Sequence, residues 1–132
     1  MSNETPGPEA AGITVDTRTE PDGAVVCRFA GDLDLDSVPT ARAALEEGVR
    51  TGPPVLVVDL EEVAFCDSSG LNLLIRTRLA AQEAAVDLRI GPLSAPVERL
   101  LEITGATEIF QLHTSTAEAL AAARAVPEAD PR

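Results

Sequence analysis

Strand-like and helix-like segments alternate along most of the chain, and this order constrains the fold more than any other feature of the sequence. Residues 13–19 and 24–30 have strand-like apolar patterns, and the turn residues Pro21-Asp22-Gly23 between them predict a β-hairpin. After the hairpin, segments with helical apolar spacing alternate with short apolar runs that are typical of strands. This order is typical of an α/β domain with one mixed, mostly parallel sheet covered by helices, and we expect about five strands and about four α-helices.

The remaining boundaries follow from caps and breakers. Ser37 or Asp36 is expected to cap the first helix, and the second is expected to begin within Asp67-Ser68-Ser69-Gly70. Ser94 and Ser115 are expected to begin the third and fourth helices. The further strands are predicted at residues 55–60, 86–90 and 109–112.

The length of 132 residues suits a single domain, which we place at residues 13–125. Residues 1–12 are polar and contain two prolines and two glycines, which predicts a disordered N-terminal tail. Residues 126–132 are expected to form a flexible C-terminal tail. The chain shows no signal peptide and no apolar run of membrane-spanning length, so we expect a cytoplasmic protein.

The charge of the chain argues against several classes of partner. The net charge is −12, which disfavours nucleic acid and anionic membrane surfaces and favours a basic protein surface. All ten basic residues are arginine, so a P-loop lysine and a Schiff-base lysine are absent from the sequence. Cys27 and Cys66 lie in apolar stretches and are expected to be buried free thiols. We expect no metal site and no cofactor.

Two loops carry the polar residues that merit a functional interpretation. Residues 31–36 (GDLDLD) follow the second strand, and residues 65–70 (FCDSSG) follow the third. Functional loops gather at the carboxyl ends of parallel strands, so both loops should share one edge of the sheet if their strands are neighbours. The acidic side chains Asp32, Asp34, Asp36 and Asp67 would then surround the two serines.

The residues alone leave three interpretations of Asp-Ser-Ser-Gly open. It can be a helix cap only. It can be a phosphorylation site, because a helix N-terminus stabilises a phosphate. It can also hold a serine nucleophile, although His113 is the only imidazole, and a Gly-x-Ser-x-Gly elbow is absent around Ser69.

The sequence resembles a known family in three places. Residues 57–71 (VVDLEEVAFCDSSGL) are similar to the signature of STAS-domain anti-sigma factor antagonists. Residues 29–35 (FAGDLDL) resemble the Gly-(Glu/Asp)-Leu-Asp landmark of that family, and residues 94–105 (SAPVERLLEITG) resemble a third landmark. The resemblance covers about residues 13–125 and implies the STAS fold.

The resemblance also implies a mechanism, called partner switching. The unphosphorylated protein would bind an anti-sigma factor that is an ATP-dependent serine kinase, and this would free the sigma factor. The kinase would phosphorylate the second serine of the motif, Ser69, and the complex would dissociate until a serine phosphatase reset it. The protein itself would carry no catalytic residues.

The resemblance further implies a partner-binding surface. Asp34 corresponds to an aspartate that the family uses in partner contact, whereas Asn72 stands where many relatives carry a small residue. The expected partner-binding residues are Asp32, Asp34, Asp67, Ser68, Ser69, Gly70, Leu71, Asn72 and Arg76. The alternative functions are a non-phosphorylated STAS subunit of a transporter or sensory complex and, as a weaker option, a hydrolase that uses Ser69.

Overall fold

A computed structural model describes residues 12–125 and contains one mixed sheet of four strands in the order β1-β2-β3-β4. β1 (Ile13–Thr19) runs antiparallel to β2 (Val25–Leu33), as the predicted hairpin requires. β2 runs parallel to β3 (Val55–Cys66), which runs parallel to β4 (Asp87–Leu93). The tails predicted for residues 1–12 and 126–132 lie almost wholly outside the described residues.

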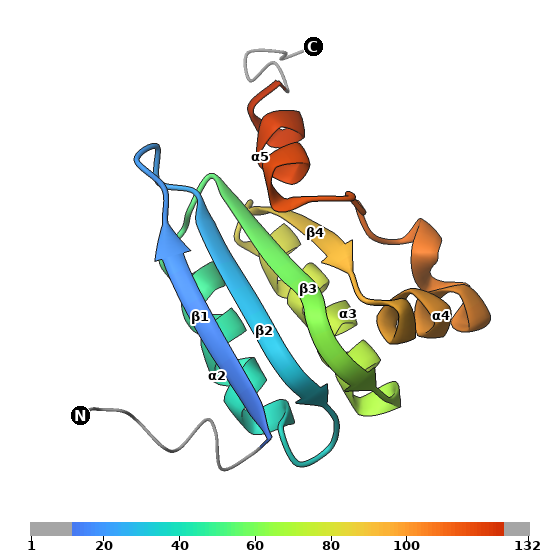
Figure 1. Ribbon diagram of the computed structural model, residues 1–132. Coiled ribbons are helices and arrows are strands. Elements are labelled where there is room, and N and C mark those ends of the chain that lie inside the picture. Colours follow the sequence, from blue (N-terminus) through green and yellow to red (C-terminus); the bar gives the residue numbers. More distant parts are fainter. Residues whose placement is uncertain (1–11, 126–132) are drawn as a thin grey trace.

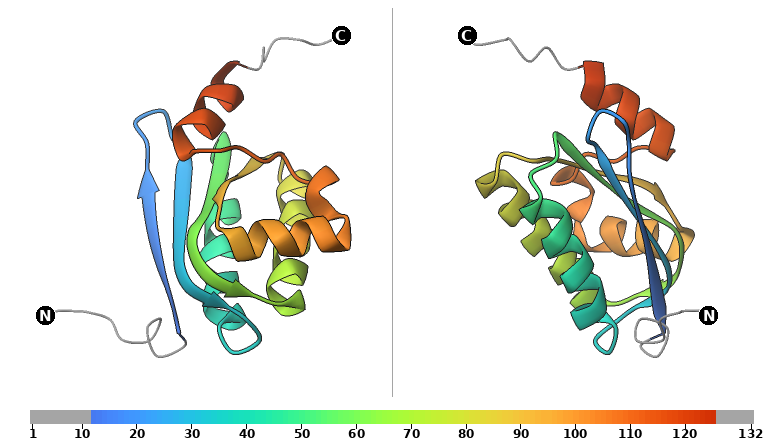
Figure 2. Two further views of the ribbon diagram at one scale, coloured as in Figure 1. Left: turned by 45° about the vertical axis from the view of Figure 1, so that its right-hand side comes forward. Right: turned by 90° about the vertical axis from the view of Figure 1, so that its left-hand side faces the viewer.

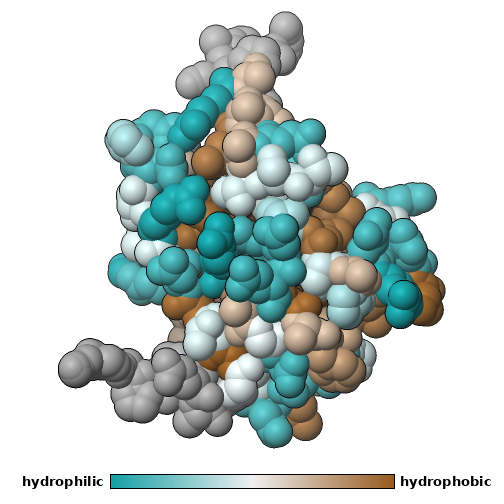
Figure 3. Space-filling model, viewed as in Figure 1, coloured by the Kyte–Doolittle hydropathy of each residue, from teal (hydrophilic) through white to brown (hydrophobic). Residues whose placement is uncertain are grey.

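The helices cover the two faces of this sheet unequally (Figures 1 and 2). α2 (Val38–Arg50), α3 (Ser68–Glu83) and α4 (Ala95–Thr104) bury their apolar sides in the main core with one face of the sheet. α5 (Thr116–Ala125) packs on the other face, where Ala119 and Leu120 join a second apolar cluster. In Figure 3 the middle of this second face is mainly hydrophilic, which explains why β1 alternates apolar and polar residues.

The strand expected at residues 109–112 is reduced to a single parallel bridge between Ile90 and Leu112. The bridge uses the amides of Ile90 and His113. The next amide that a parallel ladder needs is that of Pro92, and proline has no N–H. The pairing of residues 109–112 with β4 therefore ends after one residue pair. The 3₁₀ helix η1 (Ala106–Glu108) precedes this segment.

β2 and β3 extend farther than the apolar patterns predict. β2 includes Asp32 and Leu33, which we expected in a loop, and β3 continues to Cys66 instead of ending near residue 60. The register between β2 and β3 shifts between Arg28 and Ala30 and again between Gly31 and Asp32. Such irregularities break the two-residue alternation, so the ends of both strands look like loops in the sequence.

A buried carboxylate ties α5 to the open face of the sheet. Asp59 of β3 is 1% exposed, and its Oδ2 accepts hydrogen bonds from Nε of Arg28 at 3.1 Å and from Oγ1 of Thr116 at 3.3 Å. Its Oδ1 accepts a hydrogen bond from the Glu61 amide at 3.0 Å. A buried charge needs such partners because its hydration is lost. The side chain therefore connects β2, β3 and the start of α5.

We expect Arg28→Ala to lower the free energy of unfolding by about 2 kcal/mol, because it leaves a buried carboxylate without its cation. The matched control is Arg18→Ala, which removes a more exposed ion pair with Glu20 and should cost less than about 1 kcal/mol. Urea unfolding of both variants measures the difference. Equal losses in the two variants would contradict the role given to the Arg28–Asp59 pair.

Candidate partner-binding site

The two polar loops meet at one edge of the sheet, as the sequence predicts. Leu33 and Cys66 are register partners at the ends of β2 and β3, and the Asp67 amide donates a hydrogen bond to the Leu33 carbonyl at 3.3 Å. The acidic segment after β2 and the start of α3 are therefore side by side. We call this region the rim, and it comprises residues 32–36 and 65–72.

Gly70 is the point of closest packing within the rim. A Cβ atom at this position would lie 2.7 Å from the Leu33 carbonyl oxygen and 2.8 Å from Sγ of Cys66. Real Cβ atoms essentially never approach other atoms so closely. The glycine therefore allows α3 to begin directly against the end of β2.

Asp67 supplies the cap of α3. Its Oδ1 accepts hydrogen bonds from the amides of Ser69 at 2.9 Å and Gly70 at 3.3 Å. Within residues 12–125, neither serine hydroxyl of the motif makes a hydrogen bond. The capping residue of the Asp-Ser-Ser-Gly motif is therefore the aspartate, and both serine hydroxyls are left available for other chemistry.

The two serines are adjacent at the start of α3, and both line a hollow there with Leu71, Asn72 and Ile75. Ser68 is exposed, whereas Ser69 is half-buried. Each residue turns the helix by about 100°, so the two side chains leave α3 in directions about 100° apart. Arg76 is about 20° from Ser69 and about 80° from Ser68 around the helix axis, so it is nearer to the direction of Ser69.

The acidic segment is shaped by one buried serine. Ser37, which is fully buried, accepts a hydrogen bond from the Asp34 amide and donates its hydroxyl to the Asp32 carbonyl at 2.7 Å. Oδ1 of Asp34 in turn accepts from the Ser37 amide at 3.1 Å. Ser37 is the N-cap residue of α2, as one of the two predicted candidates, but its side chain makes no capping hydrogen bond. Asp34 fixes the loop, and the carboxylates of Asp32 and Asp36 remain available to a partner.

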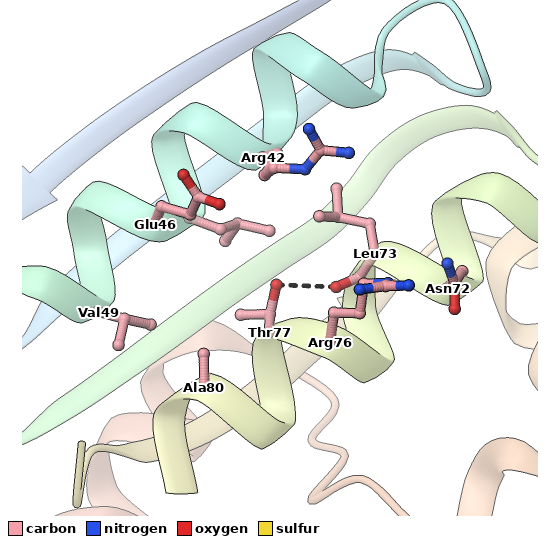
Figure 4. Close-up of a pocket in the computed structure, with 9 residues that line it drawn as sticks. Arg42, Glu46, Val49, Asn72, Leu73, Arg76, Thr77 and Ala80 are labelled. Carbon is pink, nitrogen blue, oxygen red and sulfur yellow. Dashed lines mark hydrogen bonds between the residues drawn. The ribbon is translucent and has the colours of Figure 1, made fainter. Parts of the chain in front are cut away.

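A groove of about 430 Å³ runs between α2 and α3 and begins beside the rim. Asn72 and Arg76, which we predicted to contact the partner, line it together with Arg42 and Glu46 of α2 (Figure 4). Aliphatic side chains form much of the rest of its lining, namely those of Leu45, Val49, Leu73 and Ala80. The candidate partner-binding face is therefore acidic at the rim and carries two arginines in the groove.

The sequence patterns did not predict that two large apolar side chains at the rim are exposed. Leu35 is 70% exposed and Phe65 is 50% exposed, and Phe65 is the register partner of Asp32. Phe65 lies two residues after the buried Val63, so simple alternation would place it in the core. Large apolar side chains on an exposed edge are typical of protein-binding surfaces.

Other reactive groups of the chain do not join the serines. Burial raises the pKa of the Cys66 thiol to about 11, and the neighbouring Asp67 carboxylate adds to this effect, so the thiol stays protonated at neutral pH. The ring of His113 contacts Arg89 near the start of α5, which lies at the opposite end of the sheet from the start of α3 (Figure 1). The described residues hold no cluster suited to a metal ion, and none of their helices is long and apolar enough to cross a membrane.

Comparisons with known proteins agree with this architecture. An anti-sigma-B factor antagonist of Staphylococcus aureus (strain NCTC 8325 / PS 47) is 30% identical over 104 residues, which are 79% of this chain and 95% of that protein. The crystal structure of an anti-sigma factor antagonist from Mycobacterium paratuberculosis is 27% identical, with a TM-score of 0.74 over 85% of this chain and 94% of that chain.

A third comparison concerns the fold. The unphosphorylated form of the anti-sigma factor antagonist SpoIIAA is 21% identical and has a TM-score of 0.71 over 86% of this chain and 99% of that chain. This likeness confirms the predicted STAS fold, with four strands in place of about five. The family model of the STAS domain matches residues 17–119, and the chain therefore belongs to the STAS domain family.

Proposed function

We propose that this chain is an anti-sigma factor antagonist that works by partner switching. The observation that carries the proposal is the match along nearly the whole length of a protein named as an anti-sigma-B factor antagonist. The rim supports the proposal, because its serine hydroxyls make no hydrogen bonds among the described residues. They also lie beside acidic and apolar side chains, which suit a protein partner. The unphosphorylated rim binds an anti-sigma factor serine kinase, which releases its sigma factor.

Phosphorylation of the rim ends this complex. The kinase transfers the γ-phosphoryl group of ATP to a serine oxygen of the motif; the bond to the β-phosphate breaks, ADP leaves, and the hydroxyl proton passes to a base of the kinase. A serine phosphatase restores the hydroxyl with water. This chain acts as the substrate and the binding partner in both reactions.

We propose Ser69 as the acceptor, as the family resemblance implies. Its position supports this choice, because Ser69 is within about 20° of Arg76 around the helix axis, and Arg76 lines the groove. A phosphate there is close to the N-terminus of α3 and to positive charge. Ser68 is the more exposed of the two serines, so the test must distinguish them.

The test uses the anti-sigma kinases encoded in the same genome, with ATP, and mass spectrometry of the phosphorylated peptide. Ser69→Ala should abolish phosphate incorporation, whereas Ser68→Ala, its matched neighbour, should keep it within about threefold of the unaltered protein, because both variants keep the Asp67 cap. The reverse pattern would make Ser68 the acceptor and overturn the assignment of Ser69.

The alternative is a STAS subunit that is never phosphorylated and that binds a transporter or sensory complex. It makes a different prediction in the same assay. Neither serine would receive phosphate, and the chain would not compete with a sigma factor for any of these kinases. Phosphate on either serine would exclude this alternative.

A further inference from the structure

Two arginines of the groove form no ion pair among the described residues, although the chain carries more than twice as many acidic as basic residues. Five other arginines each pair with a neighbouring carboxylate, namely Arg18, Arg28, Arg50, Arg89 and Arg124. Within residues 12–125, Arg42 and Arg76 do not, even though Glu46 lines the same groove. Both guanidinium groups are therefore available to an anion.

The groove directs these two cations toward the start of α3. Figure 4 shows the guanidinium of Arg76 extending along α3 toward Asn72, and that of Arg42 pointing to the same end of the groove from α2. Ser69 precedes Arg76 by seven residues, which is about 10 Å along the helix axis. The two residues share one flank, and helical side chains lean toward the N-terminus, so the long Arg76 side chain extends toward Ser69.

We infer that Arg42 and Arg76 form an oxyanion-binding site and that its ligand is the phosphoryl group on Ser69 of the same chain. This inference rests on the proposed phosphorylation. Arginine suits this ligand because its planar guanidinium donates paired hydrogen bonds to phosphate oxygens. Asn72 lies three residues after Ser69, and its side-chain amide can donate to the same group.

The site gives phosphorylation an effect beyond the serine itself. Before phosphorylation the groove presents two free cations to acidic side chains of the partner. Afterwards the phosphate, with about −1.5 to −2 charges, neutralises both cations. One modification therefore changes the charge of the rim and of the groove together, and the partner loses attractive contacts on both.

The inference is tested with phosphoserine placed at residue 69 by genetic encoding, so that no kinase is needed. The second pKa of the phosphate is read by ³¹P NMR. Arg42 and Arg76 should lower it, against the opposing charges of Asp67 at the cap, Glu46 in the groove and the acidic segment. We expect Arg76→Gln to raise this pKa by about 0.5, with a smaller rise in Arg42→Gln and a similar rise in 1 M NaCl.

Arg78→Gln is the matched control. Arg78 also lacks an ion pair among the described residues, but it lies on the other flank of α3, beside Asp87 and Ile109. This variant removes the same charge from the same helix and should leave the phosphate pKa unchanged. Equal shifts in Arg76→Gln and Arg78→Gln, or no shift in either, would overturn the site.

Phosphoserine at residue 68 is a second control. It changes the position of the phosphate, whereas Arg78→Gln changes the position of the arginine that is removed. Ser68 lies about 80° from Arg76 around the helix axis, against about 20° for Ser69, so the pKa of a phosphate there should respond less to Arg76→Gln. An equal shift in the phosphate pKa at both positions would show only the general electrostatic effect of a nearby arginine. It would overturn a binding site for the phosphate on Ser69.

A further arm separates bound phosphoserine from free phosphate. Unphosphorylated protein is titrated with inorganic phosphate, and the Nε–H signals of its arginines are followed by NMR. In the protein with phosphoserine at residue 69 the Arg76 signal should move and become protected from exchange, whereas millimolar inorganic phosphate should leave it in place. Binding of free phosphate at Arg76, with an unperturbed phosphoserine, would assign the site to another ligand and refute the inference.

A failed kinase assay with a positive NMR result would refute only the proposed function.

Discussion

Phosphorylation of Ser69 should weaken binding to the anti-sigma kinase by roughly 100-fold or more while the fold of the chain stays unchanged. In the proposed complex the kinase surface faces a hydroxyl at the start of α3, and poorly placed charges in an interface cost several kcal/mol. A 100-fold loss requires only about 2.8 kcal/mol. The isolated domain should tolerate the phosphate, because a negative charge at a helix N-terminus is favourable by about 0.3–1 kcal/mol.

Isothermal titration calorimetry of the two forms measures this loss, and circular dichroism and thermal unfolding check the fold. Amide NMR shifts on phosphorylation should concentrate at the rim and along the α2–α3 groove. Unchanged affinity would contradict the account. Lost affinity with shifts throughout the sheet and α5 would replace local electrostatics with a conformational switch.

Gly70→Ala should destabilise the fold and disturb the rim far more than the same change at Gly48, the other buried glycine within a helix. The added Cβ at residue 70 would lie 2.7 Å from a backbone oxygen of β2, which cannot rotate away as a side chain can. α3 must then move from the sheet. Overpacking of this kind costs about 1–3 kcal/mol, which corresponds to a loss of about 4–13 °C in the Tm of a domain of this size.

Gly48→Ala is the matched control for this prediction. Its added Cβ would lie 3.2 Å from Cδ1 of Leu56, the end of a flexible side chain. Alanine also favours the helix by about 0.5–1 kcal/mol, so the net change in stability should be small. Thermal unfolding measures both variants. A Tm loss in Gly70→Ala no larger than in Gly48→Ala would show that the junction of β2 and α3 is not tightly constrained.

Much of the fold could be predicted because local patterns agree with the tertiary structure. The hairpin follows from turn residues between two short strands, and α3 follows from its apolar spacing and the Asp-Ser-Ser-Gly segment. The meeting of the two polar loops follows from β2 and β3 being parallel neighbours. These features depend on short-range sequence and on general rules of sheet topology.

The parts that were missed depend on contacts between distant residues. The Arg28–Asp59 pair joins positions 31 residues apart, and Asp59 sits in an apolar run that predicts a plain core strand. The register shifts that expose Phe65 leave no simple pattern in the sequence. The difference between Ser68 and Ser69 depends on which side of α3 faces the sheet and which faces α2, and both follow from tertiary packing.

The central claim is that the unphosphorylated chain takes an anti-sigma factor away from its sigma factor. The most direct measurement starts from a complex of a fluorescently labelled sigma factor with its anti-sigma kinase, both from the same genome. Fluorescence anisotropy then follows release of the sigma factor as this chain is added. We predict near-stoichiometric release by the unphosphorylated protein and almost none by the form with phosphoserine at residue 69. No release from any such complex, or equal release by both forms, would contradict the account.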